Sequence, residues 1–349
     1  MNEDGSDELL VAIDGKAGRL RLNRPRAIHA LTGGMCTAMI AALQAWRGDA
    51  AVEVVMLDHA EGRGFCAGGD VVALSADAVA ARAFFHEEYR LNHLLFTYAK
   101  PTVAFMDGVT MGGGVGISQP CKYRIATENT LFAMPETGIG LFTDVGGGWY
   151  LSRLEGAMGE YLALTGARLD GAECVALGLA THYVPAGALA ALKAAIAADP
   201  GAVATLIAQA AVTPPAAGIL EHRAEIDRLF TGNTYEAILA ALAAEGSHWA
   251  DATLGTLRKK SPQTCKVCLR LVRNGRAFTD FAQEMRAEYG IAVHVIQRPD
   301  FREGVRALLI ERDNKPLWNP ATPEGVTDHM IDTIFSPLSD AEAWTPLGR

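Results

Sequence analysis

The chain has 349 residues, of which 50% are hydrophobic and 20% are charged, as is typical of a folded globular protein with room for a large core. The formal net charge of -9 disfavours a dedicated nucleic-acid binder, and no apolar run approaches the length that spans a membrane. The N-terminal letters MNEDGSDELL lack the basic-then-apolar order of a signal peptide, so we expect a cytoplasmic protein.

The first half of the chain alternates between strand and helix patterns. Helical spacing predicts helices at residues 34–46 and 77–98. Apolar and β-branched letters predict strands at residues 19–22, 52–57, 102–106, 123–126 and 131–133. Strands separated by helices of this length usually run parallel and are joined by right-handed crossovers. The sequence therefore predicts an α/β fold.

From about residue 185 the strand patterns nearly vanish and Ala- and Leu-rich helical spacing takes over. Helices are predicted at residues 188–198, 219–230, 235–244 and 262–272. The break AADPGAV favours a soft boundary at this point. We therefore expect a first region over residues 1–195 and a mainly helical region over residues 196–349 that packs on it.

Two glycine-rich loops, FCAGGD at residues 65–70 and MGGGVG at residues 111–116, each follow a predicted strand and precede a helix. Glycine lets the backbone approach a ligand closely, and two such loops side by side could offer two N–H donors to one developing oxyanion. Either loop taken alone is more often a tight turn at a strand end. The chain has no P-loop motif and no G-x-S-x-G, and Ile117 breaks the dinucleotide-binding G-x-G-x-x-G pattern.

The stretch PETGIGLFTDVGGGW at residues 135–149 places Glu136 and Asp144 in apolar surroundings. A carboxylate that loses solvation has a raised pKa, which suits a general acid or base near neutral pH. The alternative is structural: Glu136 would cap a helix start, and Asp144 would be the N-cap of the helix that follows. The residues alone leave the two interpretations about even.

Cysteine and histidine give little support for a metal or redox site. The six cysteines are scattered and are expected to be free thiols, as is usual in a cytosolic protein. Cys265 and Cys268 form a C-x-x-C pair within a helical segment, which favours buried structural thiols over a redox or zinc site. No H-x-H or H-x-x-x-H pair is present, so we expect no metal.

The motifs taken together resemble the crotonase (enoyl-CoA hydratase/isomerase) superfamily. The resemblance rests on the order FCAGGD, MDGVTMGGGVGIS and LFAMPETGIGLFTDVGGGWYLSRL, and it covers nearly the whole chain to about residue 320. AMPETGIGLFTDVGGG, FFHEEYRLN at residues 84–92 and DFREGVRALLIERDNKPLW at residues 300–318 are most like the 3-hydroxyisobutyryl-CoA hydrolase branch. The resemblance implies a crotonase-like spiral of ββα turns with a helical C-terminal region.

The resemblance also implies roles for particular residues. The thioester oxygen would lie between the backbone N–H groups of Ala67 and Gly113. Glu136 would be the main catalytic carboxylate, and Asp144 would orient the substrate or the attacking water. The residues expected to bind substrate are Gly68, Glu88, Gly113, Glu136 and Asp144.

One position separates the branches of the superfamily. Hydratases carry a second catalytic glutamate two residues after the third glycine of the GGG loop, and here that position is Gly116. This chain has Asp144 where hydratases typically have glycine. The resemblance therefore implies hydrolysis of a short branched 3-hydroxyacyl-CoA, most like 3-hydroxyisobutyryl-CoA in valine catabolism. The alternatives are an enoyl-CoA hydratase or isomerase, and a non-catalytic acyl-CoA-binding protein.

Other features of the resemblance concern the flanks of the site and the partners. Thr143 replaces a usual proline and Trp149 a usual tyrosine, and both are expected to flank the pocket. RAIHAL at residues 26–31 would contact the adenine end of coenzyme A, with Arg24, Arg26 and Lys100 as weak candidates for its phosphates. Coenzyme A would be part of the substrate, so no separate cofactor is expected. We expect no nucleic-acid or membrane partner, and a homo-oligomer is an open expectation.

Overall fold

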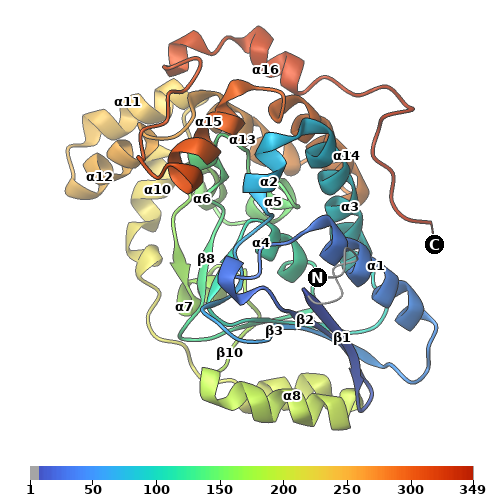
Figure 1. The fold of residues 1–349 in the computed structure, drawn as a ribbon. Helices are drawn as coiled ribbons and strands as arrows, with labels where there is room; N and C mark the ends of the chain where they lie inside the picture. Colours follow the sequence, from blue (N-terminus) through green and yellow to red (C-terminus); the bar gives the residue numbers. More distant parts are fainter. Residues whose placement is uncertain (1–7, 349) are drawn as a thin grey trace.

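Two β-sheets form the centre of the fold (Figure 1). The computed structural model describes residues 8–348, so most of the N-terminal stretch on which the signal-peptide expectation rests lies outside the described residues. In the larger sheet β1 runs antiparallel to β2 and all other neighbours are parallel. Its strand order is β1 (Leu9–Asp14), β2 (Ala17–Leu22), β3 (Val54–His59), β5 (Thr102–Met106), β7 (Tyr123–Ala126) and β10 (His182–Tyr183).

The smaller sheet carries the loops that the sequence analysis singled out. Its strand order is β4 (Gly64–Cys66), β6 (Val109–Met111), β8 (Leu131–Ala133) and β9 (Leu169–Asp170). The first three strands are parallel, and β9 is antiparallel to β8. Because β4, β6 and β8 are parallel neighbours, the segments that follow them leave the sheet at the same edge. FCAGGD, MGGGVG and PETGIG therefore meet at one place.

Helices of the first region follow these strands. Asp77 begins α3, because its side chain accepts hydrogen bonds from the amides of Val79 and Ala80. The helices of this region are α1 (Gly33–Arg47), α2 (Val71–Ala76), α3 (Ala78–Phe96), α4 (Gly113–Ser118), α5 (Gly147–Leu151), α6 (Met158–Thr165) and α7 (Gly171–Ala176). The predicted helices at residues 34–46 and 77–98 are confirmed as α1 and α3, and the predicted strands at 102–106, 123–126 and 131–133 are confirmed to the residue.

All strands among the described residues end by Tyr183, and the rest of the chain is helical. The C-terminal helices α13, α14 and α15 lie beside α6, α5, α3 and α2, so they cover the side of the fold where the loops meet (Figure 1). The helices are α8 (Leu189–Ala198), α9 (Val203–Ala210), α10 (Arg223–Leu229), α11 (Tyr235–Glu245), α12 (His248–Leu257), α13 (Pro262–Gly275), α14 (Phe281–Val295), α15 (Pro299–Val305) and α16 (Asp328–Ile334).

α8 joins the two regions. Its Leu192 and Ile196 pack on Met56 and Phe105 of the larger sheet, and Lys193 forms a 2.8 Å ion pair with the buried Asp58 of β3. The boundary expected at residue 195 thus falls inside a helix that is packed on the sheet. The division into two regions stays a prediction.

The larger of two clusters of buried hydrophobic side chains within residues 8–348 includes members from Leu9 to Trp344, so side chains from both halves of the chain share one core. Among residues 8–348, no one helix has both the length and the apolar character needed to cross a membrane; only a bent pair at residues 186–198 and 200–210 meets both criteria when the two are taken together.

Candidate active site

A cavity of about 240 Å³ lies where the loops after β4, β6 and β8 meet α3. The six residues predicted to bind the substrate or the thioester oxygen all line it: Ala67, Gly68, Glu88, Gly113, Glu136 and Asp144. The remaining wall is apolar and includes Val71, Leu74, Phe84, Phe85, Leu141 and Leu309. Leu309 comes from the C-terminal segment that follows α15, so both regions of the chain build this cavity.

The two glycine loops lie against each other. A Cβ atom added to Gly68 would lie 3.7 Å from the amide nitrogen of Gly113, and Gly68 has a φ of +115°, which only glycine adopts readily. Gly113 is the first residue of α4, so its N–H has no partner within the helix. In residues 8–348 no other acceptor is found for it either. The amide of Gly113 is thus available to a ligand in the cavity.

The other expected donor, Ala67, is corrected by the structure. Its N–H donates a 2.9 Å hydrogen bond to the carbonyl oxygen of Ile28, so it is not free for a ligand. The free amides of this loop, within the part of the chain that the structure describes, belong to Gly68 and Gly69. Motif position alone could not show this, because the acceptor lies in the distant RAIHAL segment.

Gly69 has the better orientation of the two. The carbonyl oxygen of Gly68 accepts a 2.7 Å hydrogen bond from the amide of Leu31, and the amide of Asp70 donates a 2.9 Å bond to the oxygen of Leu31. In a trans peptide the N–H points opposite to the preceding C=O, so the N–H of Gly69 points away from Leu31. Gly69 also lines the cavity. Its amide is the better candidate to pair with that of Gly113.

Three carboxylates face this cavity, and all are buried: Glu88 is 2%, Glu136 4% and Asp144 3% exposed. Burial raises the pKa of Asp144 to about 7. Burial and then the charge of Asp144 raise the pKa of Glu136 and of Glu88 well above the usual range. Oε2 of Glu136 and Oε1 of Glu88 have no hydrogen-bond partner among the described residues. These oxygens remain able to bond a substrate or a water molecule.

Asp144 is held by Tyr89 and does not cap a helix. The hydroxyl of Tyr89, on α3, donates a 2.7 Å hydrogen bond to Oδ2 of Asp144. α5 begins after Gly146 and has no side-chain cap. Glu136 lies in the first turn of a 3-10 helix, Glu136–Ile139, which also lacks a side-chain cap. The capping alternative is therefore wrong for both acids.

Lys260, which no sequence motif predicts, places a positive charge near Glu136. Its Nζ lies 3.4 Å from where a Cβ atom of Gly138 would be. The charge of Lys260 opposes the rise in the pKa of Glu136. The next residue, Ser261, donates its amide to the oxygen of Thr137 at 3.0 Å and its hydroxyl to Asp300 at 2.6 Å. These bonds fix the C-terminal region against the turn that carries Glu136.

Gly116 has no room for a side chain. A Cβ atom at this position would lie 2.6 Å from Cβ of Val145 and 3.0 Å from Nδ2 of Asn92. Val145 itself has a φ of +53°, which is rare for a β-branched residue, and it lines the cavity next to Asp144. The space that a second glutamate would need is thus filled by Val145 and Asn92.

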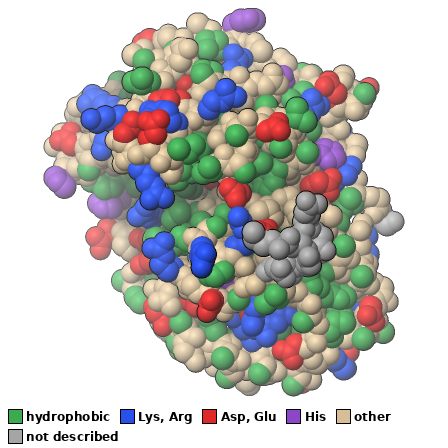
Figure 2. Space-filling view, viewed as in Figure 1, with side chains coloured by type: hydrophobic (Ala, Val, Ile, Leu, Met, Phe, Trp, Pro, Cys, Tyr) green, Lys and Arg blue, Asp and Glu red, His purple; other side chains and the backbone are tan. Residues whose placement is uncertain are grey.

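Two of the three candidates for the coenzyme A phosphates are engaged elsewhere. Arg24 forms 3.0 Å ion pairs with both Glu8 and Asp70, and Lys100 donates to the carbonyl oxygens of Trp46 and Asp49 at the end of α1. Arg26 remains a candidate. Lys and Arg side chains do gather near the middle of the face that carries α2 and α15 (Figure 2).

Thr143 and Trp149, which were expected to flank the pocket, do not line the cavity, although Thr143 directly precedes the lining residue Asp144. Trp149 packs in T-shaped contacts with Phe96 and Phe281, and the guanidinium of Arg153 lies 3.4 Å from the centre of its ring. Thr143 is fully buried, and its amide donates to Sγ of Cys268 at 3.3 Å. Thr143 thus ties the turn that carries Asp144 to Cys268 of α13, and Trp149 belongs to an aromatic cluster with Phe96 and Phe281.

The six cysteines are buried free thiols, as predicted, and Cys265 and Cys268 lie on α13. Over residues 8–348, no group of three or more His, Cys, Asp or Glu side chains is arranged to hold a metal ion.

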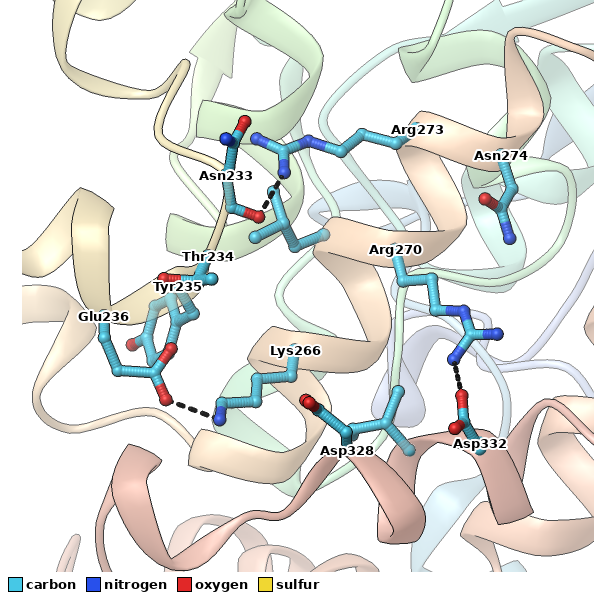
Figure 3. A pocket seen from close by; sticks show the side chains of 12 residues that line it. Asn233, Thr234, Tyr235, Glu236, Lys266, Arg270, Arg273, Asn274, Asp328 and Asp332 are labelled. Carbon is cyan, nitrogen blue, oxygen red and sulfur yellow. Dashed lines mark hydrogen bonds and ion pairs between the residues drawn. The ribbon is translucent and has the colours of Figure 1, made fainter.

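A second hollow, of about 470 Å³, lies between α11, α13 and α16 (Figure 3). Four of the charged side chains that line it form ion pairs: Lys266 with Glu236 at 2.5 Å, and Arg270 with Asp332 at 2.6 Å. Arg273 donates to the backbone oxygens of Asn233 and Gly232. This hollow is a network of partly exposed ion pairs and lacks the free buried oxygens of the first cavity.

Comparison with known proteins finds relatives over nearly the whole chain. A family model described as "Enoyl-CoA hydratase/isomerase" matches residues 17–335. The "Probable 3-hydroxyisobutyryl-CoA hydrolase 3" of Arabidopsis thaliana is 39% identical over 97% of this chain and 94% of its own length. The "3-hydroxyisobutyryl-CoA hydrolase, mitochondrial" of Danio rerio is 39% identical over 98% of this chain and 93% of its own length.

Two solved structures share the whole architecture. The crystal structure of a carnitinyl-CoA dehydratase from Mycobacterium thermoresistibile is 40% identical, covers 100% of both chains and has a TM-score of 0.93. That of an enoyl-CoA hydratase from Rhodobacter sphaeroides 2.4.1 is 35% identical, covers 97% of this chain and 99% of the other, and has a TM-score of 0.90. The fold is thus the crotonase-like α/β fold that the motifs implied, and this chain belongs to the enoyl-CoA hydratase/isomerase family.

Proposed function

We propose that this protein hydrolyses the thioester of a short branched 3-hydroxyacyl-CoA, 3-hydroxyisobutyryl-CoA first among them, as a step of valine breakdown. The observation that carries the proposal is that the free amides of Gly69 and Gly113 line the same cavity as three buried carboxylates. The curated relatives at 39% identity over nearly the whole chain bear the name of this hydrolase. An apolar cavity of about 240 Å³ suits a four-carbon branched acyl group better than a long chain.

The carbonyl oxygen of the thioester accepts hydrogen bonds from the amides of Gly69 and Gly113, and these bonds strengthen as negative charge develops on it. Glu136 then acts by one of two routes. Its carboxylate attacks the carbonyl carbon, the C–S bond breaks and the coenzyme A thiolate leaves, giving a mixed anhydride that water cleaves. Alternatively Glu136 takes a proton from a water molecule, which attacks the carbonyl carbon directly. Both routes end in a free acid, the thiol of coenzyme A and a regenerated Glu136.

Asp144 and Glu88 recognise the polar part of the acyl group. The 3-hydroxyl of the substrate lies in an otherwise apolar cavity, so it needs an acceptor there. Asp144, oriented by Tyr89, accepts from this hydroxyl or from the attacking water. Glu88 lies beside Gly113 in the cavity wall, and its Oε1 has no hydrogen-bond partner among the described residues. A proton held on one of these acids relieves the repulsion between them.

Hydration of an enoyl-CoA is the second candidate, because two structural relatives are named as a dehydratase and a hydratase. Hydration needs an acid and a base placed for two adjacent carbons of the substrate. In this chain the position of the usual second glutamate is Gly116, and Val145 fills the space beside it. The geometry therefore supports hydrolysis better than hydration.

A panel of acyl-CoA thioesters with a free-thiol readout tests the proposal. We expect 3-hydroxyisobutyryl-CoA to give the highest kcat/KM, and crotonyl-CoA to lose its ultraviolet absorbance only slowly. Fast hydration of crotonyl-CoA with no thiol release would overturn the choice of hydrolysis. Tight coenzyme A binding without turnover on any member of the panel would favour a binding protein. A cytoplasmic location and a homo-oligomeric state stay predictions.

A further inference from the structure

Glu288, on α14, lies directly behind the turn that carries Asp144. It is fully buried, and its two carboxylate oxygens accept hydrogen bonds from the amides of Gly146 at 2.8 Å and Gly148 at 3.3 Å. No other acceptor is found for these two amides among the described residues. Burying a carboxylate costs free energy of folding unless hydrogen bonds compensate for the lost water, and here the two amides supply such bonds.

The turn that Glu288 holds is strained. Val145 and Gly146 have φ values of +53° and +88° in succession, and Val145 is β-branched. Such a conformation persists only where its surroundings hold it, and in active sites it commonly serves to aim a side chain. Here the strained residues directly follow Asp144, and Val145 itself lines the cavity.

We propose that Glu288 is a positioning residue for the reaction: its carboxylate holds the amides of Gly146 and Gly148, and thereby fixes Asp144 where it meets the acyl group. This inference rests on the proposed hydrolysis. Tyr89 holds Asp144 from one side by its hydroxyl, and Glu288 holds the backbone of the same turn from the other. Glu288 does not line the cavity, so it acts only through Asp144.

A second acid accompanies Glu288. Glu284, one helical turn earlier on α14, is also fully buried, and its carboxyl group interacts with that of Glu288. Burial raises the pKa of Glu284 to about 7, and burial together with the charge of Glu284 raises the pKa of Glu288. The pair therefore retains a proton in the neutral range. The other ionisable groups that influence the pair are Asp144, Tyr89, Tyr150 and Arg153.

The test uses Glu288→Ala and Glu288→Gln, each alone and combined with Asp144→Asn. Misplacing a reacting group by about 1 Å can cost roughly 100-fold, so we expect Glu288→Ala to lower kcat/KM for 3-hydroxyisobutyryl-CoA about 10- to 100-fold. Glu288→Gln keeps one carbonyl acceptor and should lose less. Free coenzyme A should bind all folded variants with an unchanged Kd. In the Asp144→Asn background, the Glu288 substitutions should add less than about a threefold loss, because they act through Asp144.

Glu160→Gln is the matched control. Glu160 is 3% exposed and bonded to Arg276 at 2.8 Å, but it lies outside the cavity, so its loss should reduce stability and leave kcat/KM unchanged. The inference is wrong if the Glu288 substitutions lower kcat/KM by the same factor in the Asp144→Asn background as in the wild type. It is also wrong if both Glu288 variants keep the wild-type kcat/KM. If Glu288→Ala does not fold, the same comparison of kcat/KM is made with Glu288→Gln in the wild type and in the Asp144→Asn variant. A wild-type enzyme that releases no thiol would instead overturn the proposed function.

Discussion

The hydroxyl of Tyr89 donates a 2.7 Å hydrogen bond to Oδ2 of Asp144, and both side chains are almost completely buried. A donor bonded to the ionised form of a carboxyl group lowers its pKa, and this bond offsets part of the rise that burial causes in Asp144. Tyr89 therefore helps to keep Asp144 ionised near neutral pH, where its pKa is about 7.

Replacing Tyr89 by phenylalanine should raise the pKa of Asp144 further, since the stabilising donor is lost. A hydrogen bond to a charged group is worth about 1.5 kcal/mol or more, so the acid limb of the kcat/KM profile should move up by about one pH unit. Stopped-flow or steady-state thiol release between pH 5 and 9 measures this. An unmoved acid limb would show that ionised Asp144 does not limit the reaction.

Asp144→Asn should lower the activity and raise the stability of the folded protein above neutral pH. The folded-state pKa of about 7 exceeds the ordinary value of about 3.9, so the folded protein binds more protons than the unfolded chain between these values. Ionisation of Asp144 therefore lowers the free energy of unfolding of the wild type as pH rises from 4 to 7. The variant has no ionisable group at this position and does not show this loss. At pH 8 the variant should gain on the order of 4 kcal/mol in free energy of unfolding, and little at pH 4.

Urea denaturation of both proteins at the two pH values checks this second prediction, with thiol release measured in parallel. Asparagine can still accept the bond from Tyr89, so the packing should be conserved. A variant that is less stable than the wild type at pH 8 would mean that the charge of Asp144 is compensated by groups not yet identified.

Gly116→Glu should not create a hydratase. Its Cβ atom would lie 2.6 Å from that of Val145, so we expect a loss of about 1–3 kcal/mol in stability and no gain in crotonyl-CoA hydration. Gly255→Ala is the matched control, because nothing lies within 4 Å of a Cβ atom at that helical position, and it should be neutral or stabilising. A stable Gly116→Glu variant that hydrates crotonyl-CoA would show that the site lacks only one acid.

Lys260→Met should raise the pKa of Glu136, because the positive charge that opposes the rise is removed. If ionised Glu136 reacts, the variant should lose activity several-fold below pH 7 and little at high pH. Lys259→Met provides the control, since that exposed neighbour does not face Glu136. Equal losses in both variants across the pH range would argue against a specific effect of Lys260.

The sequence predicted β2, β3, β5, β7 and β8, and it missed β1, β4, β6, β9 and β10. β5 is buried throughout and apolar after Thr102, so its pattern is unambiguous. β1 is an edge strand with five of six residues exposed, and β4 and β6 have only three residues each. Short or exposed strands carry little hydrophobic pattern, and their pairing depends on neighbours that a single sequence does not place.

The site residues that belong to sequence motifs could be predicted. The residues that reach the site through the packing of distant helices could not. The loops and the acids Glu88, Glu136 and Asp144 could be named from their motifs and lie around one cavity. Tyr89 is 55 residues from Asp144 and Glu288 is 142 residues from Gly146, and only the packing of α3 and α14 brings them together. Ala67 was wrong as a donor because the motif does not reveal that Ile28 already accepts its amide.

Glu136→Gln gives the most direct test of the central claim. The substitution keeps the size and burial of the side chain and removes the carboxylate that attacks or activates water. We expect thiol release from 3-hydroxyisobutyryl-CoA to fall at least about 100-fold, with coenzyme A binding unchanged, since general-base or nucleophilic action typically contributes this much or more. A Glu136→Gln enzyme that releases the thiol at the wild-type rate would contradict the assignment of Glu136 and the mechanism built on it.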